Sequence, residues 1–174
     1  MKERQRELLT LAALCALALA LRLHRIGWGL PEVYEEATPF RIAWSMWGWG
    51  PGGHFDLDPH FFKYPSLVIY LQLLAQLLLY GALSLAGRVH SALDFRVLSQ
   101  MDAIPFMLTG RAVIAVLGSA IVIPAYAIAK RAGGAAAAAA AGMLVALSPA
   151  LIEKSQAIEV DVDEKIKPAA PSEL

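Results

Sequence analysis

Apolar residues gather in four long runs along the chain, separated by shorter polar stretches. No charged residue occurs in residues 8–21, 65–87, 112–129 or 132–152. Because a bilayer core about 30 Å thick is spanned by roughly 20 apolar residues in a helix, these runs predict membrane-spanning helices. The first run is short, but the long side chains of Arg22 and Arg25 can reach the headgroups and extend that span to Trp28. We therefore expect an all-α protein built of polytopic membrane helices.

The polar stretches divide the chain into parts. Residues 1–7 form a basic tip, 27–64 are rich in Gly, Pro and Trp, and 153–174 are polar with two prolines. We expect a transmembrane module over residues 1–152 and a disordered tail over 153–174. The first run ends in Arg-Leu-His-Arg rather than in small residues, which favours an uncleaved anchor over a signal peptide. The lone Cys15 excludes an internal disulfide.

Lysine and arginine positions predict the orientation of the spans. The basic tip belongs in the cytoplasm, so residues 27–64 lie outside. Lys130 and Arg131, between the last two runs, should also be cytoplasmic, yet three complete crossings would put them outside. The conflict disappears if the run at 65–87 does not complete a crossing, and we favour that arrangement. The net charge is zero and the basic residues are scattered, which excludes nucleic acid as a partner.

The external stretch contains a pattern typical of a short amphipathic helix. Phe40, Ala43, Trp44 and Trp47 recur at helical spacing, and the sequence Pro-Gly-Gly at 51–53 ends the pattern. Tryptophan favours the headgroup region, so we expect this helix to lie in the membrane interface. The acidic pair at 35–36 then stands at its N-terminal end.

A carboxylate at the water–lipid boundary suits proton transfer from a hydroxyl group, because partial desolvation and a like-charged neighbour raise its pKa. The alternative is that the two glutamates only oppose the dipole of the helix that follows them.

Several motifs in order give the chain a family resemblance. They are Gly-Trp-Gly-Leu-Pro at 27–31, the acidic pair at 35–36, Arg-x-Ala-Trp-x-Met at 41–46 and Pro-His-Phe-Phe-Lys-Tyr-Pro-Ser-Leu at 59–67. Over residues 8–162 the chain resembles the start of the GT-C glycosyltransferases. More narrowly, it is similar to bacterial relatives of the dolichyl-phosphate-mannose protein mannosyltransferases.

This resemblance implies an enzyme of the bacterial inner (plasma) membrane that transfers a sugar from a polyprenyl phosphate to an acceptor hydroxyl with inversion. Glu35 would be the general base and Glu36 its neighbour. The family has Asp where this chain has Glu35, and the extra methylene moves the carboxylate by roughly 1 Å. A misplacement of that size can cost about a hundredfold in rate.

The same resemblance implies further site residues. Arg111 matches an arginine that opens the next span, where a bidentate guanidinium suits a phosphate leaving group; an interface anchor is the alternative role. Asp161, after the Ser-Pro at 148–149, is the second acidic candidate. His60, Lys63 and Tyr64 are candidate substrate-binding residues within the motif at 59–67.

A divalent metal is an open question. Asp56, Asp58 and His60 alternate along the loop, and oxygen and imidazole groups at this spacing could hold such an ion. The alternative is a solvated turn without a metal, and the cofactor is therefore unknown from the sequence.

The family runs to more spans than this chain offers, so we expect an N-terminal part of such an enzyme. Its expected partners are a polyprenyl-phosphate sugar, membrane lipid and a second chain that completes the enzyme. The alternative function is a non-catalytic membrane remnant or a small assembly partner.

Overall fold

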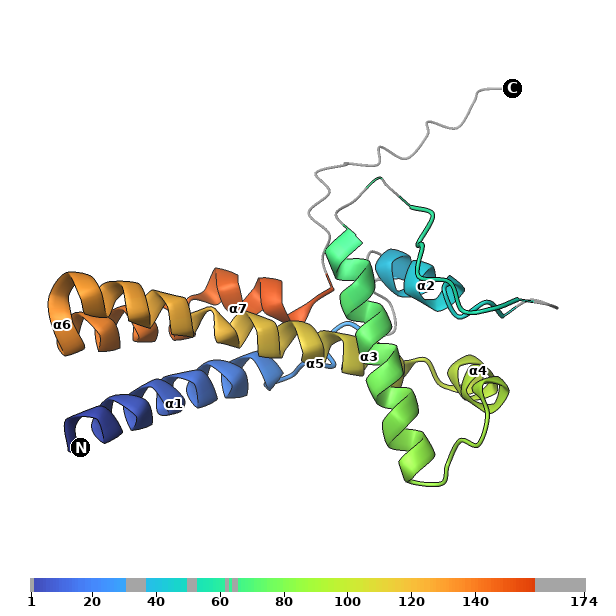
Figure 1. Cartoon of the computed structure of the whole chain (residues 1–174), viewed down its shortest axis with the longest axis horizontal. Helices are drawn as coiled ribbons and strands as arrows, with labels where there is room; N and C mark the ends of the chain where they lie inside the picture. The colour runs from blue at the N-terminus through green and yellow to red at the C-terminus, as the bar shows by residue number, and fades with distance from the viewer. Residues whose placement is uncertain (1, 31–36, 50–52, 62, 64–65, 159–174) are drawn as a thin grey trace.

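The computed structural model of the chain describes residues 2–30, 37–49, 53–61, 63 and 66–158 (Figure 1). Over these residues the protein is all-α, as the sequence predicts, with no strand. The helices are α1 (Lys2–Leu23), α2 (Ala37–Ser45), α3 (Ser66–Leu85), α4 (Ala92–Met101), α5 (Ile104–Ala120), α6 (Val122–Leu147) and α7 (Pro149–Gln156).

Helices α1, α5, α6 and α7 lie along the long axis of the molecule and form a bundle (Figure 1). Its core is made mostly of small side chains: Ala18 on α1 is buried with Ala138 and Ala146 on α6. A Cβ added at Gly142 would lie only 2.7 Å from the Cδ1 methyl of Leu14, so α1 packs into the space that this glycine leaves open. Small residues allow helix backbones to approach closely, which explains the use of the alanine-rich run at 135–141.

Helix α6 is two helical segments joined by a sharp reversal at its middle. Gly133 and Gly134 have non-helical backbone angles, and Gly134 has φ +75° and ψ −165°, a conformation that glycine adopts without steric cost. The first segment continues α5 and the second runs back alongside it (Figure 1). The predicted third and fourth runs are therefore the two arms of a helical hairpin.

Two contacts fix which ends of the bundle lie together. Lys130, beside the reversal, pairs with Glu7 of α1 at 2.6 Å between Nζ and Oε2. At the opposite end, Gln156 of α7 donates from Nε2 to the carbonyls of Leu21 and His24, at 3.3 and 2.8 Å. The N-terminal tip and the 130–134 turn thus share one end, and the ends of α1 and α7 share the other.

Helix α3 lies across the bundle instead of along it, and it contacts α5 (Figure 1). Helices α2 and α4 lie beyond α3, at the end of the molecule away from the N-terminus. A cluster of aromatic rings joins these elements: Trp44 stacks on Phe40 and contacts Phe95 of α4 and Phe106 of α5. The predicted amphipathic helix is therefore present, but its tryptophan face packs on other helices of the protein.

By length and composition, two helices of the described chain are able to cross a membrane. They are Ser66–Leu85, with mean hydropathy 1.8, and the continuous Ile104–Leu147, with mean hydropathy 2.3. The second has 44 residues, about twice what one crossing needs, and the reversal at Gly133 and Gly134 divides it. The first run, at 8–21, is helical but is flanked by Arg6, Glu7 and Arg22.

Two expectations from the sequence need correction. Arg22 does not extend toward the headgroups: its side chain is fully buried between α1, α5 and α7, because small residues there leave space for it. The boundary placed at residue 152 falls inside α7, whose last residues, 153–156, were assigned to the polar tail.

Candidate functional site

The site expected from the sequence lies only partly within the described residues. Glu35, Glu36, Tyr64 and Asp161 are outside them, whereas His60, Lys63 and Arg111 are inside.

Arg111 is the best placed of the predicted residues. It lies in the second turn of α5 and is 2 % exposed. Its Nη1 donates to the carbonyls of Ile26 and Trp28, at 2.6 and 2.7 Å, and so ties the chain after α1 to α5. Charged hydrogen bonds of this length are among the stronger ones in proteins. Arg111 is therefore built into the junction between α1 and the first loop, which is more than a surface anchor requires.

The start of the tail meets the same part of α5. A Cβ at Gly110 would lie 3.0 Å from the Cδ1 methyl of Ile158 and would overlap Oε1 of Gln72 on α3. Ile158 is 1 % exposed and is the last residue before the undescribed tail. The end of α7 and the start of the first loop therefore converge on α5 beside Arg111.

A second buried arginine lies farther along the same face of α5. Arg22 is 0 % exposed, and its Nη1 donates to the Ala18 carbonyl of its own helix at 3.1 Å. Its Nε and Nη2 have no hydrogen-bond partner. A Cβ at Gly118 would lie 3.3 Å from that Nε and would overlap Oγ of Ser155 on α7. Arg111 and Gly118 are about two helical turns apart on α5 and therefore lie on the same face of that helix. The guanidinium group of Arg22 lies against this face at Gly118.

These residues are among the buried polar side chains of α1, α3, α5 and α7, which we call the polar seam. The seam, as the term is used below, comprises Arg22, Gln72, Gln76, Arg111, Ser119 and Ser155. Both side-chain polar atoms of Gln72 lack a partner, in addition to the two of Arg22. A buried donor or acceptor without a partner costs about 1–3 kcal/mol, and more when it belongs to a charged group.

The sequence contained a signal for part of this seam. Gln72 and Gln76 are four residues apart in an otherwise apolar run, a spacing that puts both on one face of α3. Gln76 uses that position structurally: it accepts from the Trp47 indole at 2.9 Å and donates to the Phe40 carbonyl at 3.2 Å. Polar residues inside apolar spans are expensive and mark functional positions by default.

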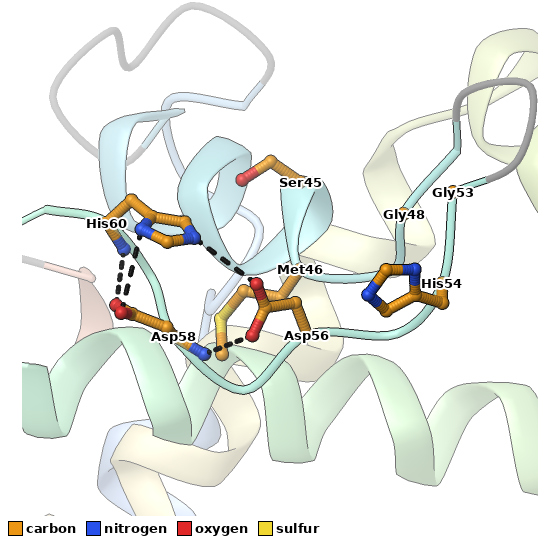
Figure 2. A pocket seen from close by; sticks show the side chains of 8 residues that line it. All are labelled: Ser45, Met46, Gly48, Gly53, His54, Asp56, Asp58 and His60. Atoms are coloured by element: carbon orange, nitrogen blue, oxygen red, sulfur yellow. Dashed lines mark hydrogen bonds and ion pairs between the residues drawn. The ribbon is translucent and has the colours of Figure 1, made fainter.

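The loop residues proposed as metal ligands form a turn of their own (Figure 2). Oδ1 of Asp56 accepts from the Asp58 backbone N–H at 2.9 Å, and Oδ1 of Asp58 accepts from that of His60 at 2.9 Å. The His60 ring lies 3.2 Å from Oδ2 of Asp56 through Nε2 and 3.6 Å from Oδ2 of Asp58 through Nδ1. The backbone N–H of Asp58, and then the His60 ring, lower the pKa of Asp56.

This geometry favours the solvated turn over a metal site. The His60 side chain is 73 % exposed, and both of its nitrogens face carboxylates. Within the described ranges, no group of three or more His, Cys, Asp or Glu residues is arranged to hold a metal ion. The turn lines an open pocket of about 340 Å³, opposite Ser45 and beside His54 (Figure 2). Lys63 is exposed.

Comparison with protein-family models, curated proteins and solved structures gives no match for this chain. Its function must therefore be argued from the arrangement of its own residues.

Proposed function

We propose that the chain is a membrane-embedded glycosyltransferase module of the GT-C type, which transfers a sugar from a polyprenyl phosphate to an acceptor hydroxyl. The observation that carries this proposal is the position of Arg111. It is a buried cation at the point where the first loop and the end of α7 meet on α5. The acidic pair at 35–36 and Asp161 belong to the segments that start from this point.

The arrangement of the bundle supports a membrane location with the first loop outside. The basic tip, Lys130 and Arg131 lie at one end, as positive-inside orientation requires of a cytoplasmic face. The first loop and the end of α7 lie at the other end. Because α3 lies across the bundle, the path from α1 to α5 needs no additional crossing, and this agrees with the non-crossing role expected of residues 65–87.

In the proposed reaction the acceptor hydroxyl oxygen attacks the anomeric carbon of the sugar from the side opposite the phosphate. The C1–O bond to the phosphate breaks, which gives inversion, and the lipid phosphate leaves with the electron pair. Glu35 takes the proton of the hydroxyl as the general base, and Glu36 is the acidic residue next to it. Arg111 stabilises the charge that develops on the departing phosphate.

The test measures sugar release from a polyprenyl-phosphate sugar by membranes that contain the chain, comparing wild type with Glu35→Gln. The substitution keeps the shape of the side chain and removes the base, so we expect release to fall by about 10²-fold or more. Arg111→Lys should also reduce release, because an ammonium replaces the guanidinium fork with a single point charge. The matched control is Arg88→Lys at an exposed arginine between α3 and α4, which should leave release unchanged.

Equal rates for wild type and Glu35→Gln would refute the catalytic assignment and favour the non-catalytic alternative. Orientation is tested separately, by replacing Glu35 with cysteine in a Cys15→Ala background. A membrane-impermeant thiol reagent should label that cysteine from outside the cell, and labelling only after the membrane is opened would rule the proposal out.

A further inference from the structure

The two nitrogens of Arg22 that lack a hydrogen-bond partner, Nε and Nη2, are the pair with which an arginine binds an anion in bidentate fashion. Nε and Nη2 carry parallel N–H groups on one edge of the guanidinium plane, and this edge binds two oxygens of a carboxylate or phosphate at once. Arg22 uses only Nη1 within the described structure, on the carbonyl of Ala18. The protein therefore holds a buried cation with its bidentate edge unused.

We propose that this edge of Arg22 binds the phosphate of a lipid phosphate monoester, at a subsite two turns along α5 from Arg111. The choice of a lipid rests on the proposed function, and it is also favoured by the surroundings. Arg22 lies in the last turn of α1, at the end of the bundle that carries the first loop. Leu117 of α5 and Ile121, the residue after its end, lie near Gly118 in the sequence and are 45 % and 46 % exposed, which gives an apolar tail a surface beside the phosphate.

Helix α7 covers this subsite and controls access to it. Ser155 stands over Gly118 beside the Arg22 Nε, and its hydroxyl donates to the Leu151 carbonyl of α7 at 2.6 Å. α7 is joined to α6 through Ser148, whose φ of −60° and ψ of 114° are not helical. Its far end is held by the two hydrogen bonds of Gln156 to the end of α1. A phosphate reaches Arg22 when these hydrogen bonds open and α7 turns about Ser148.

The experiment titrates the purified full chain in detergent with farnesyl phosphate and measures binding by calorimetry. Arg22→Gln should weaken binding tenfold or more, and Arg22→Lys should lose most of it, because lysine keeps the charge without the paired donors. Arg25→Gln, at an exposed arginine three residues on, is the matched control and should stay within twofold of wild type. Gln156→Leu releases the end of α7 and should raise the affinity threefold or more.

Three further ligands separate the sources of the phosphate. Farnesol lacks the phosphate, inorganic phosphate lacks the tail, and vesicles of phosphatidylglycerol present a phosphodiester; each should bind at least tenfold more weakly than farnesyl phosphate. Wild-type affinity in Arg22→Gln would overturn the proposal, as would equal binding of inorganic phosphate or phosphatidylglycerol. Circular dichroism and gel filtration check the fold of each variant. If Arg22→Gln does not fold, Arg22→Lys and Gln156→Leu decide the matter.

The outcome is separable from that of the proposed function. Arg22-dependent binding of farnesyl phosphate together with a Glu35→Gln variant that releases sugar normally would leave the subsite standing and remove the catalytic assignment. Loss of sugar release in Glu35→Gln together with unchanged farnesyl phosphate binding in Arg22→Gln would support the catalytic assignment and refute the Arg22 subsite.

Discussion

A methyl group added at Gly118 tests how α7 packs over Arg22. Gly118 lies in the last turn of α5, which leads directly into α6, and its ideal Cβ would overlap Oγ of Ser155 and lie 2.8 Å from the Ser155 Cβ. The Arg22 Nε, at 3.3 Å, would have to move by only a few tenths of an ångström. The clash is therefore almost entirely with one side chain of α7.

The expected magnitude follows from two opposing effects. Alanine in place of a helical glycine stabilises a helix by about 1 kcal/mol. Forcing extra volume into a packed contact costs about 1–3 kcal/mol. Gly118→Ala should therefore destabilise the protein by roughly 0–2 kcal/mol overall. In a Ser155→Gly background the overlapping atoms are gone, and the same substitution should stabilise by about 1 kcal/mol.

The assay is a double-mutant cycle on thermal or denaturant unfolding in detergent, followed by circular dichroism. The sign of the Gly118→Ala effect should reverse between the two backgrounds, with a coupling energy of about 1–3 kcal/mol. Additive effects, with a coupling near zero, would show that α7 does not rest on this face of α5. In that case α7 would not cover the Arg22 side chain, and the burial of that side chain would be refuted as well.

Three other predictions address the elements around the bundle. Hydrogen bonds, first of all from the His90 backbone N–H, lower the pKa of Asp94 in the folded protein. The stability that this carboxylate adds through the α4 cap is therefore complete above the unfolded pKa of about 3.9 and is lost as the pH falls through the folded pKa. Asp94→Asn should make the free energy of unfolding depend less on pH below about 4, and an unchanged pH dependence would contradict this. Gln76→Leu should cost about 1–3 kcal/mol, because it leaves the Trp47 indole N–H without its acceptor. It should also shift tryptophan emission to shorter wavelength, because an apolar side chain replaces a polar one beside the ring; an unshifted spectrum would speak against the contact. In a Cys15→Ala background, the variant Arg131→Cys should react with an impermeant thiol reagent only from the cytoplasmic side. Labelling from outside would show that the bundle has the opposite orientation in the membrane.

Hydrophobic patterning was sufficient to predict most of the helices. The charge-free runs at 65–87 and 132–152 correspond to α3 and to the second arm of α6 with the start of α7. Their ends were harder to place, because Ser148 and Pro149 interrupt the fourth run without a change in polarity. Likewise α5 begins at Ile104, before Arg111, since a single buried arginine does not end a helix.

Other features depended on contacts that a pattern does not contain. Helix α4 lies outside the four apolar runs, although Ser91 and Asp94 form a capping box, a signal that the sequence did carry. The burial of Arg22 had no comparable signal. It depends on Gly118 and Ser155, far away in the sequence, which leave space of the right size between α5 and α7. The same sequence pattern is equally compatible with an arginine that reaches the headgroups.

The path of the chain through the bundle limits where any active site could form. Three lengths of helix run along it: α1, then α5 with the first arm of α6, then the second arm with α7. Because this number is odd, the chain enters at the Glu7 and Lys130 end and leaves at the opposite end, where Gln156 meets α1. A fourth crossing by α3 would put the first loop and the end of α7 on opposite faces of a bilayer core about 30 Å thick. Because α3 lies across the bundle, the start of the first loop and the end of α7 lie at the same end of it.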